Sequence, residues 1–122
     1  MAIGAKRLVV GAHYGLRDWL AQRLTAVILA AYVLFFFIDL VIVARTKGAL
    51  GYDEWAGIFV PVWAKVFTLI AILALLYHAW IGMRDVWMDY VKAVGVRLTL
   101  QIATMLWLIA CAVWSVQILW SV

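Results

Sequence analysis

The order of apolar and charged positions divides the chain into three long apolar stretches separated by two short polar connectors. Residues 24–44 carry a single charge, on Asp39, and residues 66–83 and 98–122 carry none. A helix rises about 1.5 Å per residue and the hydrocarbon layer of a membrane is about 30 Å thick. Each stretch is therefore long enough to cross a membrane as one helix.

This pattern predicts an all-α integral membrane protein, a single domain over residues 1–122, with spans of about 24–44, 60–83 and 98–121. The middle span extends beyond its charge-free part because the Lys65 stem can reach the headgroups, and Pro61 is tolerated in a first helical turn. Residues 16–23, which combine Trp19 with three charges, predict a short interfacial N-terminal segment before the first crossing.

Composition excludes two other classes of protein. Hydrophobic residues make up 70% of the 122 residues and charged residues 13%, whereas a soluble domain is about 45–50% apolar and about 25% charged. A chain this short cannot bury such an excess, which excludes a water-soluble globule. The net charge of +4 comes from ten scattered basic residues without a basic stripe, so a nucleic-acid partner is not expected.

The distribution of basic residues predicts the orientation in the membrane. Three lie on one side, Arg45, Lys47 and Lys65, and seven lie on the other, in the N-terminal segment and the connector 84–97: Lys6, Arg7, Arg17, Arg23, Arg84, Lys92 and Arg97. Because basic residues concentrate on the cytoplasmic side, the N-terminus is expected to be cytoplasmic, with the positive charge facing anionic membrane lipid.

The histidine at position 78 is the first candidate functional residue. An ionisable group inside a span is costly and usually has a partner or a function. At helical spacing its face carries Ala71, Ala74, Gly82, Asp85 and Asp89. The small residues among these either let another helix approach or leave a slot for a macrocycle whose iron binds the imidazole. A simple hydrogen bond to a neighbouring helix stays open as the alternative. The other histidine, His13, precedes the first span.

A second polar group follows the middle span: Arg84, Asp85, Asp89, Tyr90 and Lys92. A tyrosine hydroxyl can donate a hydrogen bond to a quinone carbonyl while a carboxylate positions it or passes protons. Tyrosine is also common at membrane interfaces, and charged residues in connectors are usually solvated. From the residues alone both interpretations remain, and Asp39 in the first span is expected to be structural.

Two segments resemble a known family. The run LLYHAWIGMRDVWMDYVKAVGVR at 75–97 and the run RDWLAQRLTAVILAAY at 17–32 are similar to the hydrophobic membrane anchor of bacterial succinate dehydrogenase, respiratory complex II. The resemblance implies that His78 is an axial ligand of haem b, with the opposite histidine supplied by a cytochrome b partner subunit. It further implies that Tyr90 and Asp89 form part of a ubiquinone site and that Arg23 pairs with a haem propionate.

The resemblance also implies the setting of the chain. It would be a subunit of succinate:quinone oxidoreductase, without catalytic residues of its own, in the bacterial inner membrane beside cytochrome b, iron-sulfur and flavoprotein subunits, in complexes that can associate further. The haem would be shared and ubiquinone would be the substrate. A fumarate reductase anchor is the nearest alternative, and a non-redox structural or transporter-associated subunit is the alternative from another functional class.

Overall fold

The computed structural model describes the backbone of residues 2–122 and the side chains of residues 15–122. His13 therefore lies outside the described side chains. The described backbone forms four helices and no strand: α1 (Ala2–Lys47), α2 (Tyr52–Gly57), α3 (Val62–Tyr90) and α4 (Val94–Ser121). Three of these helices are long and apolar enough to cross a membrane, which confirms the predicted all-α membrane fold with three spans.

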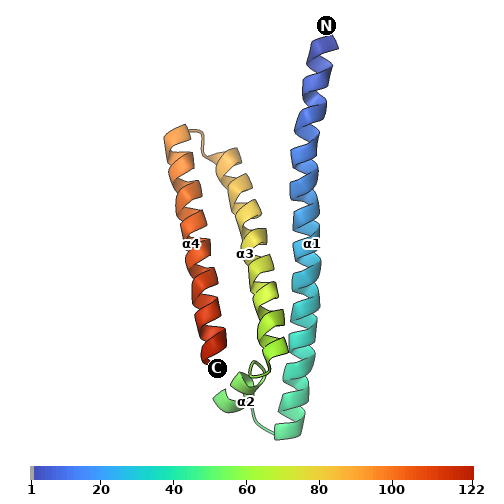
Figure 1. The fold of residues 1–122 in the computed structure, drawn as a ribbon, viewed down its shortest axis with the longest axis vertical. Helices are drawn as coiled ribbons and strands as arrows, with labels where there is room; N and C mark the ends of the chain where they lie inside the picture. The colour runs from blue at the N-terminus through green and yellow to red at the C-terminus, as the bar shows by residue number, and fades with distance from the viewer. Residues whose placement is uncertain (1) are drawn as a thin grey trace.

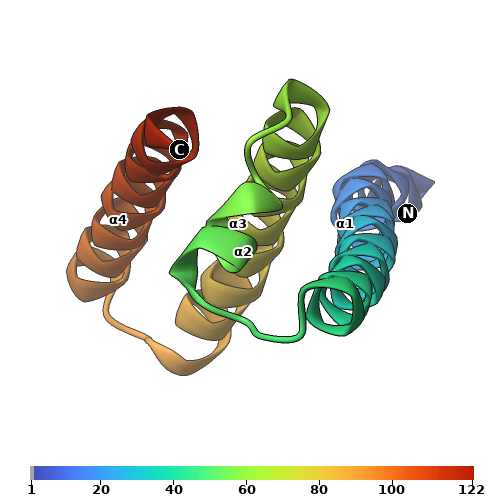
Figure 2. The same ribbon diagram turned by 90° about the horizontal axis from the view of Figure 1, so that it is seen from below.

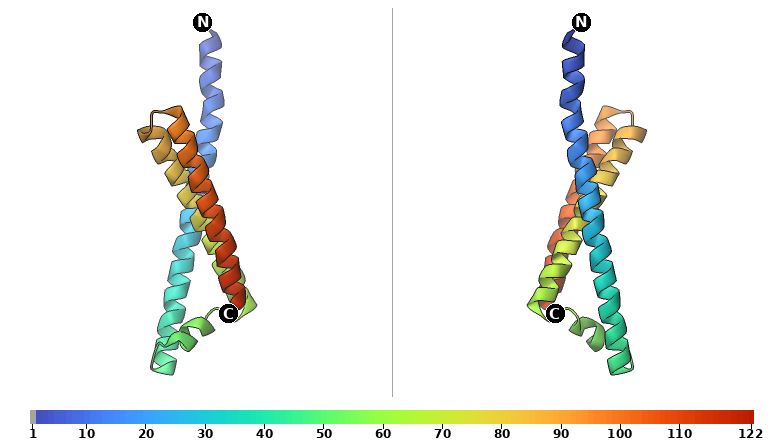
Figure 3. Two further views of the ribbon diagram at one scale, coloured as in Figure 1. Left: turned by 90° about the vertical axis from the view of Figure 1, so that its left-hand side faces the viewer. Right: turned by 90° about the vertical axis from the view of Figure 1, so that its right-hand side faces the viewer.

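The three long helices alternate in direction, and α3 lies between the other two (Figure 1). The helix α3 packs against both α1 and α4, while the short α2 contacts α1. Seen along the helices, α1 and α4 occupy opposite sides of α3 (Figure 2). From the side, α1 crosses the α3–α4 pair obliquely and its N-terminal part projects beyond both (Figure 3). The open arrangement leaves each helix with a face that no other described helix covers.

The first helix is longer than predicted. The predicted interfacial helical segment at 16–23 is continuous with the first span, because α1 runs without interruption from Ala2 to Lys47. Residues 16–47 contain neither proline nor glycine, so nothing stops the backbone hydrogen bonding. The helix ends at Gly48, whose φ of 76° is the left-handed conformation that glycine adopts without strain, and whose N–H bonds the Ala44 carbonyl at 3.0 Å.

The connector between the first two spans contains the short helix α2. At its start the Gly51 N–H donates to the Glu54 carboxylate at 3.0 Å. The Phe59 ring then packs against Trp55, with ring centroids 5.1 Å apart, and against Phe36 of α1 at 5.8 Å. Pro61 precedes α3 with φ fixed at −62° and ψ at 138°, which makes it the N-cap of α3 rather than part of its first turn.

Most of the second polar connector, 84–97, is helical. Helix α3 continues to Tyr90 and α4 begins at Val94, so only residues 91–93 join them. Arg84, Asp85 and Asp89 therefore project from helical turns. The physical reason is that charge marks where a helix leaves the hydrocarbon, whereas the backbone can stay hydrogen-bonded through the headgroup layer.

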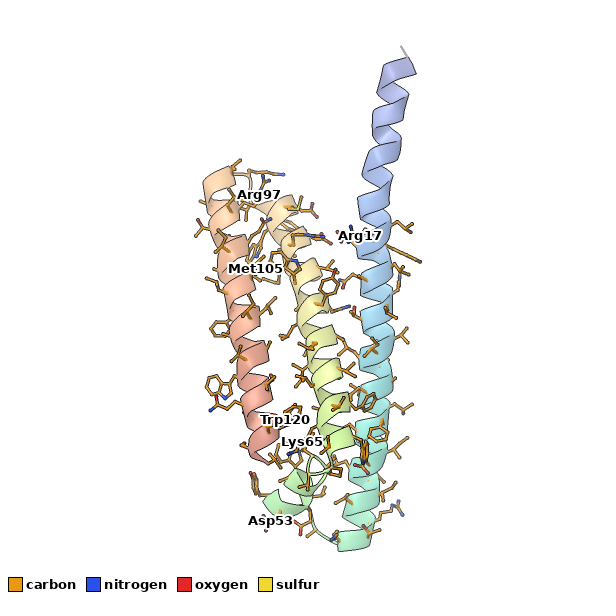
Figure 4. All side chains as sticks on the ribbon, in the orientation of Figure 1. Arg17, Asp53, Lys65, Arg97, Met105 and Trp120 are labelled. Carbon is orange, nitrogen blue, oxygen red and sulfur yellow. The ribbon has the colours of Figure 1, made fainter. Side chains whose placement is uncertain are left out.

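Few side chains are buried inside the chain. On α3 the most covered residues are small or tightly packed, namely Ala64, Ala71, Ala74 and Ile81, and Ile81 is only 1% exposed. Small residues such as these alanines allow neighbouring helices to approach closely. Most large apolar side chains remain exposed, as Figure 4 shows around α4. An exposed apolar surface of this extent fits lipid and partner helices rather than water.

Candidate functional site

Three polar contacts between side chains join α1 to α3. They pair Asp18 with Arg84, Thr25 with His78, and Tyr32 with Thr68. The three α1 residues are spaced seven apart, about two turns, so they lie on one face of that helix. Their partners on α3 follow in the reverse order because the two helices are antiparallel. We call these three pairs the α1–α3 polar ladder.

The middle pair of the ladder defines the state of the His78 ring. Its Nδ1 lies 3.0 Å from Thr25 Oγ1, and the Thr25 hydroxyl donates to the Ala21 carbonyl at 2.7 Å. A hydroxyl has one hydrogen, so Thr25 Oγ1 has only lone pairs left for His78. With that hydrogen directed to Ala21, the tautomer of His78 that bonds Thr25 carries its hydrogen on Nδ1 and donates it, which leaves a lone pair on Nε2.

The Nε2 side of His78 fits a metal-bearing group. Within residues 15–122 no hydrogen bond engages Nε2, and the residue is half-buried. One turn further along α3, a Cβ built on Gly82 would meet no heavy atom within 4 Å, so this face has open space. The described residues hold no group of three metal-ligating side chains.

The Asp18–Arg84 pair lies in a polar cavity between α1 and α3. The cavity has a volume of about 500 Å³ and is lined by Arg17, Asp18, Tyr77, Arg84, Asp85 and Met88. Arg17 lies toward the same end of the molecule as Arg97, opposite Asp53 and Lys65 (Figure 4). Two basic and two acidic groups balance each other in this lining, so the cavity itself selects neither an anion nor a cation.

The structure places Arg23 outside the ladder. Its guanidinium lies over the Trp19 ring, 5.4 Å from the centroid, and the side chain is exposed. No contact joins it to His78 within residues 15–122. Nearby, the side-chain oxygen of Gln22 is buried without a hydrogen-bond partner among those residues. It is an acceptor that a group outside this chain can satisfy.

Asp89 and Tyr90 are the last two residues of α3, and both are exposed. Tyr90 is 80% exposed. The contact of Lys92 is with the Asp89 backbone carbonyl, at 3.1 Å, rather than with its carboxylate. Within residues 15–122 the structure does not join the Asp89 carboxylate to the Tyr90 hydroxyl. Tyr90 lies twelve positions after His78, about 18 Å along the helix, so the two residues are far apart on α3.

At the opposite end of the membrane-spanning region, Asp39 lines a cavity of about 330 Å³ together with Lys47, Asp53 and Glu54. This places Asp39 beside polar groups of α1 and α2 rather than in a purely apolar environment. Its predicted structural role stays a prediction.

The sequence interpretation missed the partners of the ladder. Asp18 was treated as a solvated charge and Thr25 was not singled out, although both lie at heptad spacing with Tyr32. A repeat of polar residues every seven positions in an apolar helix was the signal that could have found them. A further contact joins α3 to α4, where the Trp87 Nε1–H donates to Thr104 Oγ1 at 3.0 Å.

Comparison with known proteins identifies the family of the chain. Residues 2–114 match the family described as succinate dehydrogenase/fumarate reductase transmembrane subunit. The chain is also 38% identical over 106 residues to the succinate dehydrogenase hydrophobic membrane anchor subunit of Coxiella burnetii, an alignment that covers 87% of this chain and 89% of that protein. On these grounds the chain belongs to the family of succinate dehydrogenase/fumarate reductase transmembrane subunits.

Proposed function

We propose that this chain, a membrane anchor subunit of succinate dehydrogenase, supplies one axial ligand of a b-type haem and part of the site at which ubiquinone is reduced. The observation that carries the first part is the Thr25–His78 hydrogen bond. It engages Nδ1 and leaves the Nε2 lone pair for iron. A bound haem supplies one-electron transfer at this depth in the membrane.

The rest of the haem site is divided between this chain and a partner. His78 is the one histidine within residues 15–122, so a second imidazole ligand would come from outside this range, on a cytochrome b partner subunit. Gly82 provides open space one turn from His78. Arg23 is exposed two residues from Thr25, and its guanidinium can leave the Trp19 ring to bind a carboxylate such as a haem propionate.

The quinone site belongs to the end of α3. The exposed Tyr90 hydroxyl donates a hydrogen bond to a quinone carbonyl, and the neighbouring Asp89 carboxylate exchanges protons with water. The exposure of Tyr90 in the single chain fits a pocket that the cytochrome b and iron-sulfur subunits complete. The isoprenoid tail of ubiquinone stays in the surrounding lipid.

The other reactions of the complex take place on its partner subunits. The flavoprotein oxidises succinate, and the iron-sulfur protein passes electrons to the α3 end that bears Tyr90. With the N-terminus of α1 cytoplasmic, this end faces the cytoplasm of a bacterial cell, and the chain lies in the inner membrane. The partner proteins and the quinone decide whether the complex oxidises succinate or reduces fumarate.

The proposal is tested by the reduced-minus-oxidised absorbance spectrum of the purified complex. The wild-type complex is expected to show a b-type haem, and His78→Ala is expected to remove or perturb it while succinate oxidation with a soluble electron acceptor continues. Leu73→Ala is the matched control, because Leu73 lies on the same helix and is exposed. An unchanged haem spectrum and EPR signal in His78→Ala would refute the ligand role.

A further inference from the structure

We infer that Thr25 is the positioning residue of the proposed haem ligand: its hydroxyl oxygen accepts the Nδ1–H of His78, and so fixes the tautomer and the plane of the imidazole ring. This inference rests on the proposed haem ligation by His78. It assigns to α1 a direct part in the haem site, although α1 contributes no ligand to the iron.

The inference rests on the direction of two hydrogen bonds at Thr25 Oγ1, one to the Ala21 carbonyl and one with His78 Nδ1. A threonine inside a helix readily donates to the carbonyl four residues earlier, and here that contact, to Ala21, is the shortest of the three at Oγ1. With its only hydrogen committed, Oγ1 serves His78 as an acceptor. The alternative tautomer would place a hydrogen on Nε2, where it would prevent coordination of a metal.

The surroundings of Thr25 make this contact stable. Thr25 is 7% exposed, so water does not compete for its hydroxyl oxygen. The other two pairs of the ladder lie about two turns to either side along α1. They hold α1 in register against α3, and the register decides which α1 residue faces His78.

The hydrogen bond also affects the electronic properties of the ligand. Donation of Nδ1–H to an acceptor makes the imidazole a stronger electron donor through Nε2, which stabilises the oxidised iron. Removal of the acceptor is therefore expected to raise the midpoint potential of the haem. It also frees the ring to rotate, and ring orientation affects the EPR g-values of a low-spin ferric haem.

Thr25→Val tests the inference, because valine keeps the branched shape and lacks the oxygen. The whole complex is purified and its haem is measured by redox titration and EPR. We expect a more positive midpoint potential and shifted g-values. Thr104→Val is the control: the Thr104 hydroxyl also makes a contact between helices, with Trp87 of α3, but it lies outside the α1–α3 polar ladder. The control is expected to keep the wild-type potential and g-values.

Thr25→Ser keeps the hydroxyl group and removes the methyl group, so it shows which of the two matters. It also keeps the inference testable if Thr25→Val loses haem altogether. Wild-type haem properties in Thr25→Ser support the inference. The inference is overturned if Thr25→Val has wild-type potential and g-values, or if Thr25→Ser is as impaired as Thr25→Val. The proposed function fails separately, through an unchanged haem in His78→Ala.

Discussion

Asp18 of α1 and Arg84 of α3 form an ion pair across the helix interface, about two turns along α1 from the hydrogen bond between Thr25 and His78. The pair lies at the end of the ladder where the helices leave the apolar layer, and both side chains are partly exposed. It closes the α1–α3 interface beside the proposed haem ligand. This position gives the pair a role in helix register rather than in redox chemistry.

The first prediction concerns this ion pair. Asp18→Asn and Arg84→Gln are each expected to lower the stability of the complex modestly, by about 0.5–1 kcal/mol, because water screens a partly exposed pair. The exchange of the two charges, Asp18→Arg with Arg84→Asp, is expected to recover part of the loss. Apparent melting temperatures of the purified complex measure these effects.

Arg17→Gln is the control for the ion pair, since Arg17 lines the same cavity without being part of the pair. High salt should reduce the difference between wild type and the Asp18 variant, as expected of a partly exposed interaction. The double variant Asp18→Asn with Arg84→Gln gives the contrary outcome. If its loss of stability equals the sum of the losses in the two single variants, the two side chains do not stabilise the complex as a pair.

The sequence was sufficient for the number of spans, but not for the helix ends. Hydrophobic length predicts how many times a chain crosses, because the hydrocarbon thickness is fixed. It does not predict where a helix stops, because Arg84 and Asp89 can project into the headgroup layer from a continuous helix. For the same reason Arg17 and Asp18, in the predicted interfacial segment, belong to the same continuous helix as the first span.

The partner of His78 was beyond the sequence interpretation for a different reason. An intramembrane histidine stands out in a sequence because placing an ionisable side chain in the hydrocarbon layer costs free energy. Thr25 is a common residue in an apolar helix and has no such free-energy cost. Its role depends on the register of α1 against α3, which is a tertiary property. Tyr90 shows the opposite case: the sequence singled it out, but a single chain leaves it exposed, because its proposed pocket requires other subunits.

A second prediction concerns the open face beside His78. Gly82→Leu is expected to deplete haem, because its side chain would occupy the space next to the ligand, where a Cβ meets no heavy atom of the described chain within 4 Å. Leucine is a better helix former than glycine by about 1 kcal/mol, so weakening of α3 would not explain the loss. Haem content per complex, from absorbance and protein mass, gives the result.

Gly95→Leu is the matched control, because Gly95 lies in α4 and a Cβ there is equally free of contacts. It is expected to keep the full haem content. Normal haem in Gly82→Leu would argue that the group bound by His78 does not extend over this turn.

A third prediction addresses the contact between α3 and α4. The Trp87 Nε1–H donates to Thr104 Oγ1, and hydrogen bonds between membrane helices contribute about 0.6 kcal/mol on average. Trp87→Phe and Thr104→Val are expected to lower the apparent melting temperature slightly, with a coupling of that size in the double variant. Trp114→Phe, on an exposed surface of α4, should have no such coupling with Thr104→Val.

The last prediction separates the two proposed sites on α3. Tyr90→Phe removes the hydroxyl and keeps the ring, so ubiquinone reduction is expected to fall about tenfold, the loss that corresponds to one hydrogen bond of about 1.4 kcal/mol. The haem spectrum should not change, since about 18 Å along the helix separates Tyr90 from His78. Tyr52→Phe is the control, because Tyr52 is a similarly exposed tyrosine at the other end of the molecule. Equal quinone turnover in the Tyr90 and Tyr52 variants would remove Tyr90 from the quinone site and leave the haem ligand unaffected.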